Sequence, residues 1–365
     1  MRLSRTLFLY FGRQFLLWFV AILAGLLFII LLFEVVELLR RAAKIGGVPF
    51  ATVVQMGLLK LPETAQKIIP FSILFGAMFG FWKLTRSHEL VVVRAAGVSV
   101  WQFLAPPVAV ALLIGITTVT LVNPVSAVLS ARFDRMEARH LRGQDDAFVV
   151  SGNGLWLREV RSDGSYSVVR ADAVDARSQR LQGVALLEFD AGGRFVDRLD
   201  ATEAELQPGQ WLLRQVWRNA PGKATERLET LAHPTELTLQ RIQENFAPPD
   251  TLSFWDLPHF IATLEASGFS ALSHRLHYQT LLALPLLLAA MVLLAAPFSL
   301  RNTRHGGASL LIGGGIATGF VLFVMNDIVQ SLGASEVLPV VMAAWAPTAI
   351  SLMAGGSALL HQEDG

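Results

Sequence analysis

The chain has 365 residues, of which 53% are hydrophobic and only 16% are charged, and its mean hydropathy is +0.49. Soluble domains carry about 25% charged residues, so this composition argues against an ordinary soluble enzyme, and its hydrophobicity excludes a disordered chain. The formal net charge of +1 gives no basic field for nucleic acid, and the absence of cysteine excludes disulfides, thiolate catalysis and cysteine-ligated metals.

Six apolar stretches account for the low charge content, and they are residues 14–33, 68–82, 95–131, 276–300, 305–326 and 337–362. Because a helix rises about 1.5 Å per residue, roughly 20 residues cross a hydrocarbon core of about 30 Å. The stretches also lack the alternation of barrel strands, so we predict six transmembrane helices. The first is too long for a signal-peptide core and is followed by Glu34 and Glu37 instead of a cleavage site.

The second stretch is short and carries Pro62 and Pro70, and residues 56–61 extend it backwards across Lys60, Glu63 and Lys67. A buried core helix is the alternative for this stretch, since proline disfavours a helix interior.

The loop between the second and third stretches, residues 83–100, contains a short apolar run after Ser87 and Glu89. We expect Ser87 to cap a short helix and Gly97 to end it. Such a helix at the membrane face can dock into a groove on a soluble partner, or it can be an interfacial turn without a special role.

Charges return between residues 132 and 275. Residues 165–169, 184–189, 202–206 and 211–217 read as short strands separated by turns, which predicts an inserted all-β sandwich or jelly-roll-like domain over residues 132–250. A connecting helix is expected in residues 251–275, starting at Ser253 in a capping box with Asp256, although Pro258 favours a start nearer Asp256. The domains expected are thus 1–131, 132–250, 251–275 and 276–365.

Basic residues in the short loops predict the orientation. Three groups fall on one side, which we take as cytoplasmic: Arg2, Arg5 and Arg13; Lys83, Arg86 and Arg94; Arg301 and Arg304. Residues 327–336, on the other side, contain no lysine or arginine. Both termini are then cytoplasmic, and the β domain is periplasmic in a Gram-negative cell.

The first outer loop is expected to hold Arg40, Arg41 and Lys44, against this rule. They can snorkel to lipid phosphate or pair with Glu34 and Glu37, since Glu37 and Arg41 have i, i+4 spacing. Alternatively, they form a site for an anionic group at the outer leaflet.

Other polar and small residues indicate no cofactor or metal site. His274 and His277 have i, i+3 spacing, but no third ligand is evident, so no metal is expected. The sequence has no phosphate-binding loop of the form G-x-x-x-x-G-K-[ST], so this chain is not expected to bind ATP in the usual P-loop way. Glycines at 313–315 and 319, with Gly76 and Gly80, indicate close helix packing.

The chain resembles the LptF/LptG family of lipopolysaccharide-export permeases over its whole length, and its LptG members most. The resemblance rests on three spans, a β domain and three further spans, and on the run from Ser87 through Glu89 to Gly97. Further matches are Gly154-Leu155-Trp156, Ala295-Ala296-Pro297-Phe298-Ser299, Gly319-Phe320-Val321 and Asn326-Asp327.

The resemblance implies a heterodimer with an LptF-like permease, driven by an LptB-like cytoplasmic ATPase dimer in the inner membrane. The complex would extract lipopolysaccharide and pass it to a β-jelly-roll bridge that begins with an LptC-like protein. Glu89 would contact the ATPase, with Arg86 and Arg94 as lesser contacts. Arg40 and Arg41, with Lys44 nearby, would bind the lipid phosphates. Glu34 departs from the basic residue that some relatives carry there.

Two other classes of function remain as alternatives. A secondary transporter would need paired acids or broken helices near the midplane, whereas these charges lie at the span ends. A non-transporting scaffold or sensor with a periplasmic β domain would need neither an ATPase contact nor a basic outer cluster.

Overall fold

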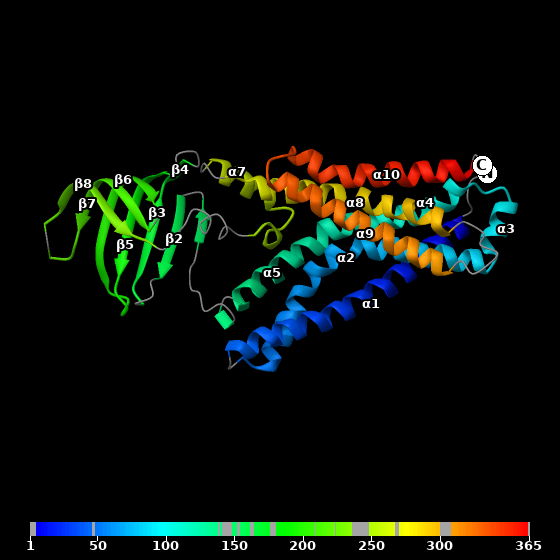
Figure 1. Ribbon diagram of the computed structural model, residues 1–365, viewed down its shortest axis with the longest axis horizontal. Helices are drawn as coiled ribbons and strands as arrows, with labels where there is room; N and C mark the ends of the chain where they lie inside the picture. The colour runs from blue at the N-terminus through cyan, green and yellow to red at the C-terminus, as the bar shows by residue number, and fades with distance from the viewer. Residues whose placement is uncertain are drawn as a thin grey trace. The chain divides into compact units, whose positions relative to one another are not determined.

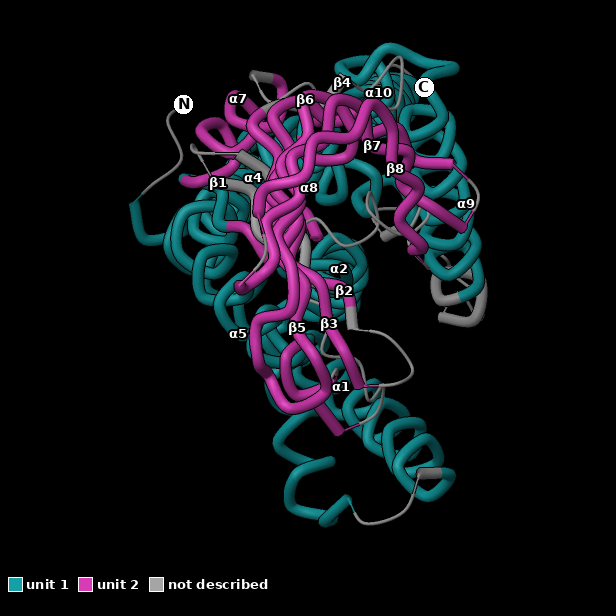
Figure 2. Tube along the Cα trace, turned by 90° about the vertical axis from the view of Figure 1, so that its left-hand side faces the viewer, with its two compact units in different colours: residues 1–134, 253–255, 275–365 teal, residues 135–252, 256–274 magenta. Residues whose placement is uncertain are grey.

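The computed structural model describes residues 5–45, 48–137, 139–140, 148–151, 154–160, 164–175, 180–207, 209–222, 224–235, 248–266, 270–299 and 308–363. The chain divides into two compact units, which Figure 2 distinguishes by colour. The membrane unit comprises residues 1–134, 253–255 and 275–365, and the β unit comprises residues 135–252 and 256–274. Arg2, Arg301 and Arg304, which support the predicted orientation, lie outside the described residues.

Six helical segments in the described part of the chain are long and apolar enough to cross a membrane, as predicted. The membrane unit is built from these helices and their short links (Figure 1). In chain order the elements are α1 (Arg5–Ile45), α2 (Phe50–Arg86), α3 (Glu89–Ala95), α4 (Val100–Thr117), the π-helical turn η1 (Thr118–Val122), α5 (Asn123–Glu137), α8 (Leu272–Ser299), α9 (Ala308–Ala334) and α10 (Val340–Glu363). The third span consists of α4, η1 and α5 together, and α3 is a short helix between the second and third spans.

The second predicted span is a long helix and not a short core helix. α2 runs without interruption through Pro62 and Pro70. A proline removes one backbone hydrogen bond from the helix, and α2 tolerates this loss because it packs along α1 and contributes a row of buried residues, including Ile73, Leu74 and Ala77.

The helices also continue beyond the apolar stretches. α1 extends to Ile45, so Arg40, Arg41 and Lys44 lie on its last turns, and not in a loop as expected. Leu38 and Ala42 are buried on this extension, which explains why the helix continues past the apolar run. Similarly, α9 continues to Ala334, past the end of the fifth apolar stretch at residue 326.

Glycines allow close helix contacts at several crossings. A Cβ built on Gly76 of α2 would lie 2.9 Å from Cα of Phe19 in α1, and one on Gly115 would lie 2.5 Å from Cα of Pro285 in α8. Gly315 of α9 is equally close to Met78. The predicted packing role is therefore confirmed for Gly76 and Gly315. A Cβ built on Gly313 would have no neighbouring atom of the described residues within 4 Å.

The β unit is an antiparallel sheet, confirming the predicted inserted all-β domain. Its strands pair in the order β1-β2-β3-β5-β6-β7-β8, with β4 on β5. They are β1 (Phe148–Ser151), β2 (Gly154–Val160), β3 (Tyr166–Ala171), β4 (Ala173–Asp175), β5 (Arg180–Phe189), β6 (Phe195–Gln207), β7 (Gln210–Asn219) and β8 (Glu226–Pro234).

One cross-strand row interrupts the sheet. The backbone pairing leaves out Gly183, Thr202 and Gln215 on neighbouring strands, and both Gly183 and Gln215 have positive φ, +62° and +51°. A side chain at Gly183 would also collide with Asp172, whose Oδ2 would lie 2.3 Å from the added Cβ. This row crosses β5, β6 and β7 part-way along their length, and interruptions of this kind bend strands.

The last strand returns over the sheet. Thr235, directly after β8, donates a hydrogen bond to the carboxylate of Glu159 on β2, although β3, β5, β6 and β7 separate these strands. His233 likewise lies 3.5 Å from Glu188 of β5. The sheet is therefore rolled, and its interior contains apolar residues such as Leu186 and Leu199.

The connecting segment differs from the predicted capping box. After a 3-10 turn, η3 (Pro249–Thr251), α7 spans Leu257–Ala266, so it begins next to Asp256, as Pro258 favours, and not at Ser253. Residues 253–255 belong to the membrane unit instead. There the backbone N–H of Phe254 donates a 2.7 Å hydrogen bond to Oδ1 of Asn123, which accounts for the difference.

Candidate functional site

The link between α2 and α3 is a tight turn of two residues, Ser87 and His88. Ser87 ends α2, and its backbone N–H donates to the carbonyl of Lys83, so its side chain does not cap α3 as expected. His88 occupies the capping position with a left-handed backbone, φ +59°. Gly97, with φ +81°, follows the end of α3, as predicted. The turn reverses the chain and sets Glu89 at the first position of a short helix.

The carboxylate of Glu89 is held at both oxygens. Tyr10 of α1 donates a 2.8 Å hydrogen bond to Oε2, and the hydroxyl of Ser87 donates one of 2.8 Å to Oε1. A carboxylate has about four lone-pair sites, so half of its accepting capacity remains for a partner. Glu89 is thus oriented and still able to bind a cation.

A groove of about 290 Å³ lies beside this carboxylate, between the start of α1 and the face of α3. Its lining combines apolar and polar groups: Leu7, Tyr10, Phe11, Ser87, His88, Glu89, Val92 and Val93. Leu90 is buried and anchors α3, whereas Val91 and Val92 are 47% and 67% exposed. The helix therefore presents apolar side chains and a fixed carboxylate on its outer surface.

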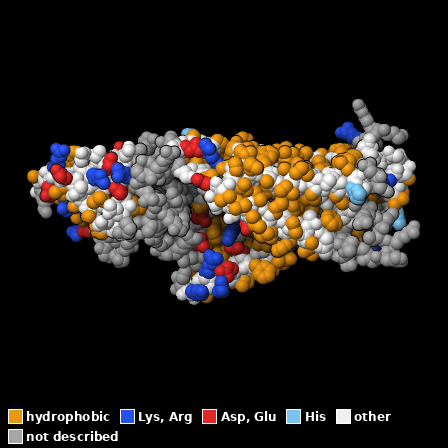
Figure 3. Space-filling model, turned by 45° about the horizontal axis from the view of Figure 1, so that its top comes forward, with side chains coloured by type: hydrophobic (Ala, Val, Ile, Leu, Met, Phe, Trp, Pro, Cys, Tyr) orange, Lys and Arg blue, Asp and Glu red, His pale blue; other side chains and the backbone are white. Residues whose placement is uncertain are grey.

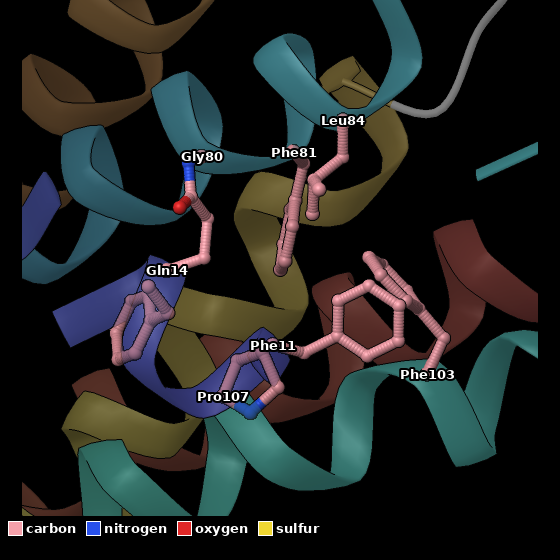
Figure 4. Close-up of a pocket in the computed structure, with 8 residues that line it drawn as sticks. Phe11, Gln14, Gly80, Phe81, Leu84, Phe103 and Pro107 are labelled. Carbon is pink, nitrogen blue, oxygen red and sulfur yellow. The ribbon is translucent and has the colours of Figure 1, made fainter. Parts of the chain in front are cut away.

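The start of α1 is fixed by an aromatic junction. Figure 4 shows Phe11, Phe81 and Phe103 converging from α1, α2 and α4. The ring of Phe103 lies 4.8 Å from that of Phe11 and 5.4 Å from that of Phe81, in edge or tilted contacts. Such contacts stabilise the crossing beyond the apolar area that they bury. The junction holds Tyr10 next to Glu89.

Arg86 and Arg94 flank the turn on exposed positions. The guanidinium of Arg86 lies over the ring of Trp82, 5.3 Å from its centroid, and Arg94 lies in the last turn of α3. The structure therefore brings Glu89 and Tyr10 together, while Arg86 and Arg94 border the same surface.

A second polar cluster lies on the last turns of α1. Arg40 donates to both oxygens of Glu37, each at 2.9 Å, and Nε of Arg41 donates to Oε1 at 3.0 Å. Arg40 and Arg41 are 68% and 52% exposed. The predicted i, i+4 pairing is therefore present, and two guanidinium groups share one carboxylate. Lys44 lies in the last turn of the helix.

Sequence reasoning missed the ionic contacts that α2 makes with its neighbours. Lys60 pairs with Glu34 of α1 at 2.8 Å, and its Nζ lies 5.3 Å from the ring centroid of Phe133 in α5. Glu63 pairs with Lys67 and accepts a 3.2 Å hydrogen bond from Ser130. Only the Glu63–Lys67 pair has i, i+4 spacing in the sequence. The contacts of Lys60 with Glu34 and Phe133, and that of Glu63 with Ser130, depend on how α1, α2 and α5 pack.

Among the described residues, no three histidine, aspartate or glutamate side chains come together in a way that could hold a metal ion. His274 instead packs its ring on Phe260, with centroids 5.0 Å apart. The candidate functional sites are therefore the Glu89 carboxylate, which Tyr10 of α1 contacts, and the cluster of Glu37, Arg40 and Arg41 on the last turns of α1. Both are suited to contacts with charged partners.

These features define an integral membrane protein with six spans, an inserted antiparallel β unit and an exposed short helix on the loop between two spans. Comparison with known families then identifies it more closely. The family described as "Lipopolysaccharide export system permease LptF/LptG" matches residues 9–361. The chain therefore belongs to the LptF/LptG family, and it is a permease subunit of lipopolysaccharide export.

Curated relatives agree with this assignment. The chain is 26% identical over 304 residues to the lipopolysaccharide export system permease protein LptG of Escherichia coli K12, covering 80% of this chain and 81% of that protein. It is 24% identical over 356 residues to the LptG protein of Haemophilus influenzae, covering 95% and 96%. The similarity thus includes both the helices and the β unit.

Proposed function

We propose that the chain pairs with an LptF-like permease and, driven by an LptB-like ATPase dimer, extracts lipopolysaccharide from the outer leaflet of the inner membrane. The lipid would then pass to a periplasmic bridge that begins with an LptC-like protein. The observation that carries the proposal is the fixed Glu89 carboxylate on an exposed apolar helix, because a permease without its own nucleotide site needs a surface for its motor.

The α3 surface is suited to an ATPase groove lined by apolar groups and a basic residue. Val91 and Val92 offer exposed apolar area, and Glu89 offers a preoriented acceptor for an arginine or lysine. Arg86 and Arg94 supply further contacts at the border. ATP is bound and hydrolysed by the partner, and this chain needs no cofactor.

The cluster at the other end of α1 is suited to lipid phosphate. Glu37 neutralises only one of the two guanidinium groups that it binds, so Arg40, Arg41 and Lys44 keep a net positive charge on exposed side chains. Arginine binds phosphate through two parallel hydrogen bonds, and a phosphate carries more charge than the carboxylate that it would replace.

The permease partner and the acyl chains would use the apolar faces of α1 and α9. Phe33 and Val36 of α1 and Phe320 and Val321 of α9 are each more than 60% exposed within this chain. Figure 3 shows the apolar belt over the helices and the charged side chains on the β unit. In water such a surface is unfavourable, so lipid or another subunit must cover it.

The proposed orientation follows from the basic residues on the short loops. The α3 turn and both termini would lie in the cytoplasm, and the β unit would lie in the periplasm. The rolled sheet has an apolar interior, around Leu186 and Leu199, that would receive acyl chains and continue the bridge.

A co-purification experiment tests the proposal against a scaffold or a secondary transporter. The tagged full-length chain is extracted in mild detergent, and an ATPase is sought in the purified complex. Retention of the ATPase by the wild type and by Glu229→Ala, an exposed glutamate on β8, but not by Glu89→Ala, is the expected result. A wild-type chain that never retains an ATPase would contradict the proposal.

A further inference from the structure

Both candidate sites include residues of α1. Tyr10, near the start of α1, contacts Glu89, and Arg40, near its end, lies in the Glu37 cluster. Thirty residues separate Tyr10 from Arg40, which at about 1.5 Å per residue corresponds to roughly 45 Å of helix. α1 contains no proline, the commonest cause of a sharp kink. A displacement at one end of α1 can therefore reach the other.

The Tyr10 hydroxyl is the contact through which such a displacement would reach Glu89. Ser87 belongs to the same turn as Glu89 and moves with it, whereas Tyr10 is 79 residues away in sequence and belongs to another helix. A hydrogen bond weakens steeply when its geometry is disturbed, so a shift or rotation of α1 by about an ångström would release one carboxylate oxygen.

We propose that Tyr10 is a positioning residue that links the lipid-binding helix to the motor-binding carboxylate. With the hydrogen bond intact, Glu89 presents a fixed pair of lone pairs to the ATPase. When the far end of α1 responds to lipid, the bond lengthens and Glu89 is presented differently. The proposal rests on the proposed function, since it assumes that the ATPase binds at Glu89 and that the lipid binds near Arg40.

The test uses the full complex of this chain with its partner permease and ATPase in lipid nanodiscs. Two quantities are measured, the amount of ATPase retained and the ratio of ATP hydrolysis with and without purified lipopolysaccharide. Tyr10→Phe removes the hydroxyl and keeps the ring. The matched control, Tyr278→Phe, removes a hydroxyl in α8 and keeps the ring that stacks on Phe254 at 5.3 Å.

We expect Tyr10→Phe to retain the ATPase and to lower the lipid stimulation at least about threefold, near the lower end of what one hydrogen bond contributes. Tyr278→Phe should match the wild type. The link is overturned if Tyr10→Phe keeps full lipid stimulation, if it loses the ATPase as Glu89→Ala does, or if lipid does not stimulate the wild type. Retention of the ATPase by Glu89→Ala would instead overturn the proposed docking site itself.

Discussion

Arg40 donates two hydrogen bonds of 2.9 Å, from Nε and Nη2, to the two carboxylate oxygens of Glu37. This is the fork geometry with which arginine also binds phosphate, so an internal carboxylate occupies the position that a lipid phosphate would take. Arg41 binds the same carboxylate through one hydrogen bond. Glu37 therefore orders both arginines and competes with the proposed ligand.

Glu37→Gln is expected to increase lipid binding at this cluster. The substitution removes the competing charge and keeps the size of the side chain. Exposed ion pairs are weak, so photocrosslinking of lipopolysaccharide beside Arg41 should rise by no more than about fivefold. Glu229→Gln on β8 is the control for charge removal alone. Reduced crosslinking would contradict this prediction. It would mean that Glu37 favours lipid binding by ordering the arginines more than it opposes binding by competing with the phosphate.

Reversal of both arginine charges should have the opposite effect. In Arg40→Glu with Arg41→Glu, three neighbouring carboxylates on the last turns of α1 would repel phosphate. Crosslinking should fall at least about tenfold, as expected for the loss of two charge-assisted contacts. The control reverses two exposed arginines of the β unit, Arg194→Glu with Arg227→Glu. Unchanged crosslinking would leave the arginines with a purely local role.

Glu89→Ala is expected to abolish the ATPase contact and preserve the fold. Tyr10 and Ser87 would lose an acceptor, but both are at a surface where water replaces it, so stability should change by less than about 1 kcal/mol. ATPase affinity should fall at least about tenfold, because a charge-assisted hydrogen bond is lost. Titration of the purified ATPase onto the reconstituted permease measures this, and normal lipid export by the variant would exclude the docking role.

Gly76→Ala should destabilise the membrane unit. The added Cβ would lie 2.9 Å from Cα and 3.0 Å from the backbone N of Phe19, so α1 and α2 must separate. Overpacking of this kind costs about 1–3 kcal/mol, which should lower the melting temperature in detergent by several degrees. Gly25→Ala in α1 is the matched control, because nothing lies within 4 Å of its added Cβ. Equal melting temperatures for the two variants would contradict the close crossing.

Thr235→Val should loosen the rolled sheet. It removes the hydroxyl that donates to both oxygens of the buried Glu159 carboxylate, at 2.9 and 2.8 Å. Loss of a hydrogen bond to a charged group costs about 1.5–3 kcal/mol. Hydrogen exchange of β2 and β8 should therefore become faster, while Thr225→Val, which loses only an exposed contact to Asn219, should leave it unchanged. If hydrogen exchange of β2 and β8 is no faster in Thr235→Val than in the wild type, the contact between Thr235 and Glu159 does not hold β8 in place.

Hydrophobicity predicts the spans well because lipid requires helices of a fixed length, and all six appear where expected. It does not predict their ends, since the extension of α1 to Ile45 depends on the burial of Leu38 and Ala42 against other helices. Strand signals identified the centre of the β unit. They missed β8, whose exposed and polar residues lack a clear alternation, although it pairs along most of β7.

In the candidate sites too, the sequence predicts the contacts within one segment and does not predict the contacts between helices. Local spacing predicted the pairing of Glu37 with Arg41, and the motif after Ser87 drew attention to Glu89. Tyr10 could not be found from the sequence, because its bond to Glu89 joins positions 79 residues apart. The pairing of Glu34 with Lys60 likewise depends on the crossing of α1 and α2. Contacts between helices require their packing, which sequence periodicity alone does not specify.

The central claim is that this chain moves lipopolysaccharide with energy delivered through Glu89. The most direct measurement reconstitutes the chain with its partner permease and ATPase in proteoliposomes. It then follows the transfer of lipopolysaccharide to an added periplasmic acceptor protein, with and without ATP. The account predicts transfer that requires ATP and is lost in Glu89→Ala but kept in Glu229→Ala. Transfer that proceeds without ATP, or that survives Glu89→Ala, would contradict it.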